Sequence, residues 1–282
     1  MRIFVTGATG FIGSHFVRAA LAAGHTVTAL RRGPDSRPVI ALDEDQPGSQ
    51  LTWIDGGLGD VATHHLKNHD ALVHLAAAGV KPGAAQWKEC FEVNVSQSLN
   101  FWLRAADAGV GKFLICGSCF EYGRAADRYD LIPADAPLEP TGPYHASKAA
   151  ASMAAHGLGV QRKLQLAILR PFHVFGEGES ADRLWPSLRR AAERGEDFPM
   201  TLGEQVRDFI PVGDIAEAFL RCLGQELTPG VPLVANLGTG KPQTLCDFAG
   251  HWWKAWGATG SLLLGQVPYR ADEVMRYVPE LS

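Results

Sequence analysis

The sequence contains no long run of basic residues, no low-complexity segment and no apolar stretch of membrane-spanning length. Its 26 Lys and Arg residues are interspersed with 30 Asp and Glu residues, which gives a formal net charge of -4. This balance offers no basic surface to a nucleic-acid backbone or to an anionic membrane, so we expect neither partner. The first residues also lack the long apolar core of a secretory signal, and we expect a cytoplasmic protein.

Cysteine is scarce as well. The five cysteines are an odd number, and most of them are widely spaced. Only Cys116 and Cys119 stand three residues apart, without a second pair that would complete a zinc site. We therefore expect reduced thiols and no bound metal.

Short apolar segments rich in strand-forming residues alternate with segments of helical periodicity in the first part of the chain. The segments predicted as buried parallel strands are 2–7, 25–30, 51–54, 71–77, 112–118 and 164–171. The predicted helices are 11–24, 90–109, 144–159, 187–195, 211–224 and 244–256. This alternation predicts an α/β fold with a Rossmann-type, doubly wound parallel sheet.

Beyond the last predicted strand the alternation breaks down, which indicates a smaller C-terminal lobe interleaved with the first domain. We expect a dinucleotide-binding domain at residues 1–170, to which residues 205–235 return. The substrate-binding lobe would then comprise residues 171–204 and 236–282. The polar segment 33–50 contains proline and glycine and is predicted to form a surface loop.

Three glycines follow the first predicted strand and open the first predicted helix: Gly7, Gly10 and Gly13. A glycine turn in this position lets backbone N–H groups approach a pyrophosphate closely, and the helix N-terminus adds partial positive charge. The spacing alone is a weak signal, but the strand before it and the helix after it make it specific. The motif predicts a dinucleotide cofactor.

Arg31 and Arg32 stand at the end of the second predicted strand, where an NAD site usually has an acidic residue for the ribose hydroxyls. Two cations in this position favour the 2′-phosphate of NADP. We therefore expect NADP as the cofactor. NAD is the alternative, because a surface pair of arginines can also simply be solvated.

Tyr144 and Lys148 lie four residues apart in a predicted helix, so their side chains share one face. An ammonium group beside a phenol favours the ionised form, and such a pair can transfer a proton near neutral pH. Ser118 ends a buried strand, at the sheet edge where parallel-sheet proteins hold their ligands. It is the expected third member of a catalytic set.

These motifs together resemble those of extended short-chain dehydrogenases/reductases of the NAD-dependent epimerase/dehydratase type. The similarity runs along nearly the whole chain and includes TGATGFIG, HLAA, YHASK, LRPFHVFGEGE, RDFIPVGDIAEA and NLGTG. It implies Ser118, Tyr144 and Lys148 as the catalytic residues of an enzyme that acts on a nucleoside-diphosphate sugar. It also implies a homodimer, because relatives often dimerise through the helices around 84–107 and 141–157.

The same resemblance implies two sets of binding residues. The implied cofactor contacts are Gly7, Gly10, Phe11, Ile12, Gly13, Arg31, Arg32, Leu75, Ala76, Ala77, Asn94, Tyr144, Lys148, Pro171, His173 and Val174. The implied substrate contacts are Ser118, Cys119, Phe120, His173, Arg207 and Arg270. The two arginines suit a diphosphate because a guanidinium group binds phosphate oxygens in pairs.

Two positions depart from the family pattern. Gly57 stands where relatives often have an aspartate that hydrogen-bonds adenine, which leaves Asp55 or Asp60 as substitutes. His173 stands where the family commonly has asparagine. An imidazole can still donate to the substrate there, or it can be a packed, partly buried histidine without a role in proton transfer.

The turn after Ser118 distinguishes between reaction types. In relatives that dehydrate hexoses, an adjacent Asp-Glu pair follows this position, whereas here Cys119 and Phe120 follow it. Glu121 is the nearby carboxylate, and an extended segment would point it to the opposite face from Phe120. We therefore expect NADP-dependent reduction of a nucleoside-diphosphate 4-keto-6-deoxyhexose. The alternatives are a nucleotide-sugar epimerase that retains NAD and, from another class, a non-catalytic NADP-sensing regulator.

Overall fold

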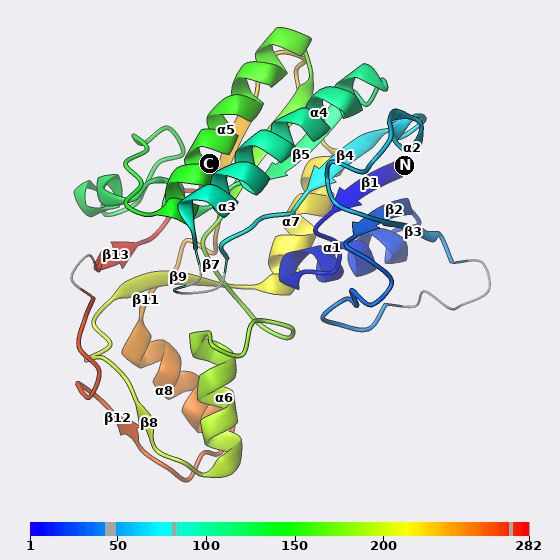
Figure 1. Cartoon of the computed structure of the whole chain (residues 1–282). Helices are drawn as coiled ribbons and strands as arrows, with labels where there is room; N and C mark the ends of the chain where they lie inside the picture. The colour runs from blue at the N-terminus through cyan, green and yellow to red at the C-terminus, as the bar shows by residue number, and fades with distance from the viewer. Residues whose placement is uncertain (43–48, 81–82, 84, 271–272, 282) are drawn as a thin grey trace.

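A seven-stranded sheet, in which every neighbouring pair is parallel, forms the centre of the protein (Figure 1). The structure is a computed structural model, and it describes residues 1–42, 49–80, 83, 85–270 and 273–281. The strand order is β10-β6-β5-β4-β1-β2-β3. The strands are β1 (Arg2–Thr6), β2 (Thr26–Arg31), β3 (Leu51–Asp55), β4 (Ala71–His74), β5 (Lys112–Cys116), β6 (Gln165–Pro171) and β10 (Leu233–Leu237). The predicted doubly wound, Rossmann-type sheet is confirmed.

Helices cover both faces of this sheet, as the near-continuous apolar strands require. One face is covered by α1 (Phe11–Ala22) and α7 (Val212–Gly224), and the other by α2 (Thr63–Leu66), α4 (Ser98–Asp107) and α5 (Pro143–Arg162). Successive side chains of β1 alternate between the two cores: Ile3 and Val5 join the α1/α7 side, whereas Phe4 joins the α4/α5 side. The segment 33–50, predicted to be a surface loop, contains no helix or strand within its described residues.

The predicted helix 90–109 is interrupted by a wider turn. It consists of α3 (Trp87–Phe91), a π-helical segment, η1 (Glu92–Gln97), and α4. The Ser98 hydroxyl donates to the carbonyl oxygen of Val93, five residues earlier, at 2.8 Å. Such π-helical turns are often found at functional sites, and this one carries Asn94.

The remaining elements form a smaller lobe, which lies below the large sheet in Figure 1. In its four-stranded sheet, β9 (Val206–Pro211) pairs with β7 (His173–Phe175), β11 (Pro242–Thr244) and β13 (Arg276–Tyr277). Residues of α6 (Leu184–Arg194) and α8 (Leu245–Ala255) share a separate core. A two-stranded sheet of β8 (Phe198–Pro199) and β12 (Leu262–Leu263) completes the lobe.

The segment 205–235, expected to return to the first domain, is divided between the two sheets. Its first part, β9, lies in the four-stranded sheet because its hydrogen-bonding partners are all strands of that sheet. Its later parts, α7 and β10, do join the large sheet. β10 continues to Leu237, two residues beyond the expected end of the segment.

The described residues also include two short 3-10 helices between β5 and α5: η2 (Cys119–Glu121) and η3 (Arg124–Arg128). Within the described ranges, no helix is both long and apolar enough to cross a bilayer.

Candidate active site

The turn between β1 and α1 can be formed only by glycine at two of its positions. Gly7 has a positive φ of 70°, and a Cβ atom there would lie 2.6 Å from the backbone nitrogen of Ala76. A Cβ atom on Gly13 would lie 2.0 Å from the carbonyl oxygen of Gly7. A side chain at either position would collide with backbone, so glycine lets the turn pack tightly while the first N–H groups of α1 lack helical partners, an arrangement that fits a bound pyrophosphate. Gly10, Phe11 and Ile12 complete this turn, as predicted from the motif.

A buried histidine supports the turn from the neighbouring strand β4. The Ser98 hydroxyl is used as a donor to Val93, so His74 Nε2 donates to Ser98 Oγ at 3.1 Å. Its Nδ1 then accepts from the Thr6 hydroxyl at 2.9 Å. Burial lowers the pKa of His74 to about 3, so the imidazole is neutral. Leu75, Ala76 and Ala77 follow this strand, and Ala76 lies directly against Gly7.

Arg31 ends β2, and its side chain is hydrogen-bonded through Nε. Its Nε donates to Asp55 Oδ1 at 2.6 Å, and the guanidinium carbon lies 5.1 Å from the centre of the Trp53 ring. Arg32 is exposed, and no hydrogen bond or ion pair involves its side chain in the described part of the chain.

The two acidic residues expected near adenine are Asp55, which accepts from Arg31, and Asp60. Asp60 accepts from the backbone nitrogen of Gly57 at 2.8 Å. Both acidic substitutes for the adenine contact therefore already have partners in the protein.

The structure brings Ser118, Tyr144 and Lys148 together at the carboxyl end of β5. Tyr144 and Lys148 lie in the first two turns of α5, and the Ser118 side chain is close enough to that of Tyr144 to lower its pKa. The ammonium group of Lys148 donates to the carbonyl oxygen of Cys116 at 2.6 Å.

Burial dominates the electrostatics of Tyr144. It raises the pKa of Tyr144 above its ordinary value of 10, and the neighbouring Ser118 side chain acts in the opposite direction. The expected influence of Lys148 on this phenol stays a prediction. Tyr144 is therefore a protonated phenol at neutral pH, and it can donate a proton.

Asn94 anchors the π-helical segment to the site. Its Oδ1 accepts from the backbone nitrogen of Ala78 at 2.7 Å, and its Nδ2 donates to the carbonyl oxygen of the same residue at 3.1 Å. The Nδ2 group also donates to Ser147 Oγ at 2.9 Å. Ser147 lies between Tyr144 and Lys148 in sequence, so Asn94 connects the loop after β4 with the helix that carries both residues.

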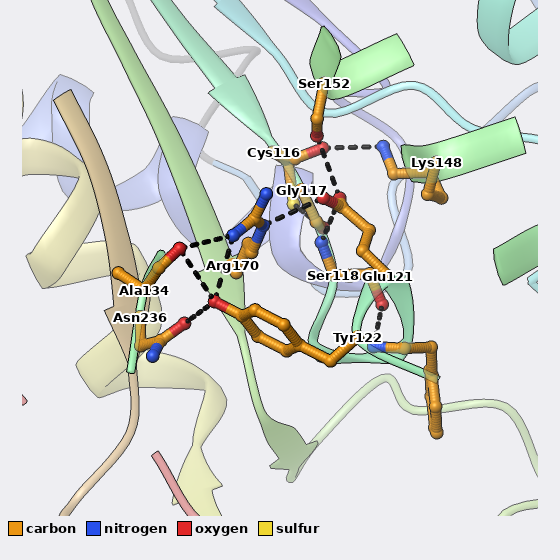
Figure 2. Close-up of polar contacts among 11 residues, drawn as sticks. Cys116, Gly117, Ser118, Glu121, Tyr122, Ala134, Lys148, Ser152, Arg170 and Asn236 are labelled. Atoms are coloured by element: carbon orange, nitrogen blue, oxygen red, sulfur yellow. Dashed lines mark hydrogen bonds and ion pairs between the residues drawn. The ribbon is translucent and has the colours of Figure 1, made fainter. Parts of the chain in front are cut away.

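Glu121 points into the protein interior rather than toward the open side of the site. Figure 2 shows its carboxylate between Arg170, Ser152 and the backbone of Ser118. The segment forms a 3-10 turn instead of the expected extended chain, with Ser118 as its N-cap. This turn directs the Glu121 side chain into the interior, where it is fully buried.

Aromatic side chains surround the other residues of this turn. The Phe120 ring stacks on His145 at 4.9 Å between centroids and makes edge contacts with His173 and Tyr277. Burial, together with the positive charge of nearby arginines, holds the pKa of His173 well below its ordinary value, so its imidazole is neutral. Burial raises the pKa of Cys119 to about 12, so its thiol is protonated. Of the remaining implied cofactor contacts, Pro171 ends β6 and Val174 lies in β7, beside His173.

The two arginines expected to bind the diphosphate are placed very differently. Arg207 is buried in β9, and its guanidinium donates to Glu273 Oε1 at 2.7 Å and to the carbonyl oxygens of Val274 and Met275. Arg270 is exposed, and no polar contact of its side chain occurs among the described residues. No contact brings the two guanidinium groups together.

Two buried groups of the site were missed at the sequence level. The first is the chain from Thr6 through His74 to Ser98, which depends on contacts between distant segments. The second is the ion pair of Glu121 with Arg170. Only the second left a local signal, because a serine followed three residues later by glutamate is the pattern of a capping box.

The fold and the site define a dinucleotide-binding α/β enzyme with a tyrosine–lysine pair at the carboxyl edge of its sheet. The sequence model of the NAD dependent epimerase/dehydratase family matches residues 3–238, and the chain belongs to this family. The resemblance seen in the motifs is confirmed.

Known relatives perform several reactions on nucleotide sugars. A UDP-glucose 4-epimerase of Neisseria meningitidis serogroup B is 28% identical over 92% of this chain and 83% of its own length. A GDP-6-deoxy-D-mannose reductase of Pseudomonas aeruginosa is 29% identical over 79% of this chain and 70% of its own. The structure of a dTDP-glucose 4,6-dehydratase of Streptomyces venezuelae, determined with NAD, has a TM-score of 0.83 and 26% identity, and the match covers 100% of this chain and 88% of that one. This chain is an enzyme of the same nucleotide-sugar epimerase, dehydratase and reductase family.

The low pKa of His74 predicts an acid-sensitive fold. Because the folded-state pKa of about 3 lies below the ordinary value of 6.5, the contribution of His74 to stability is present above pH 6.5 and is lost as the pH falls. Below that pH, the wild-type protein should lose about 1.4 kcal/mol per pH unit more than the His74→Gln variant does. Urea unfolding of both proteins at neutral pH and at about pH 5 measures this difference. Parallel losses in the two proteins would contradict the assignment.

Proposed function

We propose that this enzyme reduces the keto group of a nucleoside-diphosphate 4-keto-6-deoxyhexose, with NADPH as the reductant. The observation that carries the proposal is a set of Ser118, Tyr144 and Lys148 beside a turn that offers no free carboxylate. Such a site can add or remove one proton at a single carbonyl oxygen. It lacks the pair of carboxyl groups that sugar dehydration requires.

None of the three residues after Ser118 offers the free carboxyl group that dehydration requires. Cys119 is buried, and its pKa of about 12 leaves it a very weak acid at neutral pH. Phe120 has no group that ionises. Glu121 is fully buried, and both of its carboxylate oxygens are occupied by protein donors.

In the proposed reaction, the Tyr144 phenol donates its proton to the carbonyl oxygen of the sugar. The Ser118 hydroxyl accepts from the backbone nitrogen of Phe120 at 3.3 Å and lies next to the Tyr144 side chain; with substrate bound, we expect it to turn its proton from Tyr144 to that carbonyl oxygen. The Lys148 ammonium stabilises the phenolate that Tyr144 becomes. A reduced nicotinamide, held at the glycine turn and by Tyr144 and Lys148, supplies the hydride when it is bound.

We assign the remaining expected roles in the same proposal. The smaller lobe, with residues 171–204 and 236–282, binds the nucleotide-sugar, and Arg207 and Arg270 serve its diphosphate. For Arg207 this requires exchange of the Glu273 carboxylate for phosphate oxygens. A homodimer through α3 and α5 is supported by two large apolar side chains on these helices, Trp87 and Met153, which are 59% and 61% exposed.

A nucleotide-sugar 4-epimerase is the second candidate. It is favoured by the UDP-glucose 4-epimerase of Neisseria meningitidis among the relatives and by the NAD in the dehydratase structure. The same three catalytic residues could oxidise and then reduce one carbon with a retained cofactor. The non-catalytic regulator finds no support, because it needs none of these three side chains.

Cofactor stoichiometry separates the two reactions. With a nucleotide-linked 4-keto-6-deoxyhexose, we expect one NADPH to be oxidised for each molecule of sugar reduced. The loss of NADPH absorbance measures this oxidation. With UDP-glucose or UDP-galactose, we expect no epimeric product by chromatography. Interconversion of the UDP-sugars without net cofactor change would replace the reductase proposal with the epimerase.

The position of Arg31 predicts a preference for NADPH over NADH. Asp55 occupies only Nε, so the terminal guanidinium nitrogens remain able to bind a 2′-phosphate. One charge-assisted hydrogen bond contributes about 1.5–3 kcal/mol, so NADPH should bind at least about tenfold more tightly. Arg31→Asp should abolish this preference, and Asp55→Asn should increase it by removing a competing charge. Dissociation constants from nucleotide fluorescence test this; equal values for both cofactors in the wild-type protein would refute it.

Loss of the Tyr144 hydroxyl should stop proton transfer without displacing the cofactor. Tyr144→Phe is expected to lower kcat by about 100- to 10,000-fold, since general acid catalysis contributes that much. Its dissociation constant for NADPH should stay close to the wild-type value, because the glycine turn is unchanged. Near-normal turnover in this variant would show that another group donates the proton.

A further inference from the structure

Glu121 is a fully buried carboxylate whose two oxygens are both occupied (Figure 2). Its Oε1 accepts from the backbone nitrogen of Ser118 at 2.8 Å and from the Ser152 hydroxyl at 2.9 Å. Its Oε2 accepts from Arg170 Nε at 2.8 Å. The side chains of the ion pair are 0% and 6% exposed, so neither charge is solvated by water.

Arg170 extends the network to the far edge of the sheet. Its Nη1 donates to the Tyr122 hydroxyl and to the carbonyl oxygen of Ala134, both at 2.9 Å. The Tyr122 hydroxyl in turn donates to Asn236 Oδ1 at 2.6 Å. The side chain of Arg170 is therefore held by partners from the turn after β5 and from a loop, and the Tyr122 hydroxyl links this network to β10.

Gly117 permits this arrangement. A Cβ atom on Gly117 would lie 2.8 Å from both Arg170 Cγ and Glu121 Oε1. The ion pair thus packs directly against the backbone that leads into Ser118, and any side chain at Gly117 would displace it.

The network also reaches the helix that carries the tyrosine–lysine pair. Ser152, which donates to Glu121, lies one helical turn after Lys148 in α5. Glu121 is thus hydrogen-bonded both to the turn of Ser118 and to the helix of Tyr144 and Lys148. Its negative charge also interacts favourably with the Lys148 ammonium.

We infer that Glu121 is a positioning residue, which fixes the Ser118 hydroxyl relative to α5 by accepting from the Ser118 backbone, and that Arg170 holds Glu121 in place. Buried ion pairs can often be replaced by apolar residues without loss of stability, so the place of this pair between Ser118 and α5 points to a role beyond stability. The inference rests on the proposed function in one respect, since it takes Ser118 as catalytic.

Two double variants separate the hydrogen bond from the ion pair. Glu121→Gln with Arg170→Met removes both charges but keeps an oxygen that can accept from Ser118. Glu121→Leu with Arg170→Met removes the charges and the acceptor. A displacement of Ser118 by about 1 Å can lower turnover by about 100-fold.

We therefore expect the Gln variant to retain kcat within about tenfold of wild type and the Leu variant to lose about 100-fold in kcat, with little change in the NADPH dissociation constant. Thermal unfolding of both variants checks that they fold. Glu139→Gln is the matched control, since it breaks an exposed ion pair with Arg128, and it should leave kcat unchanged. Equal kcat in the two double variants would overturn the inference.

A second measurement needs neither a substrate nor a variant. The Ser118 amide should exchange with deuterium much more slowly than the amides of exposed turns, because it donates to a buried carboxylate. Fast exchange at Ser118 would refute the positioning contact even if the enzyme proves to be a reductase. Conversely, a protected Ser118 amide in a protein without reductase activity would leave the contact valid and reject only the proposed reaction.

Discussion

The approach of the β1–α1 turn to the end of β4 is the contact on which the rest of the site depends. Gly7 lies against Ala76, and Gly13 lies against Gly7, so the first helix begins directly at the sheet edge. Side chains are excluded from this contact, and the backbone N–H groups at the helix start remain open to an anion. The neutral His74 beneath the turn ties β1 to α4 through Thr6 and Ser98, without placing a charge beside the cofactor site.

The parallel order of the large sheet then gathers the remaining groups. Since all seven strands end at one edge, the turns after β1, β2, β4, β5 and β6 lie beside one another. Lys148 closes the site from the helix side by donating to the last residue of β5. Asn94 does the same from the π-helical segment, where the wider turn brings it within reach of both Ala78 and Ser147. The site is therefore assembled from backbone contacts as much as from side chains.

Local patterns predicted six of the seven strands of the large sheet because buried parallel strands are read directly from apolar runs, but they missed β10. They predicted the helix at 90–109 as continuous, since nothing in its periodicity reveals the π-helical segment Glu92–Gln97. The partner of Arg31 could not be foreseen either. Asp55 meets it only because the register of β2 with β3 places the two residues side by side.

The direction of the Glu121 side chain shows how one turn can decide whether a carboxylate is available for proton transfer. In an extended segment its carboxylate would have been available to a substrate. The capping interaction with Ser118 instead closes a 3-10 turn, and Arg170 receives the carboxylate in the interior. A carboxylate at this turn can therefore either face a substrate or pair with a buried cation. Which of the two occurs depends on whether a cation such as Arg170 lies within reach in the interior. Glu121 is buried in an ion pair and its neighbours at this turn are a thiol and a phenyl ring, so the turn offers no free carboxylate for chemistry at a second carbon.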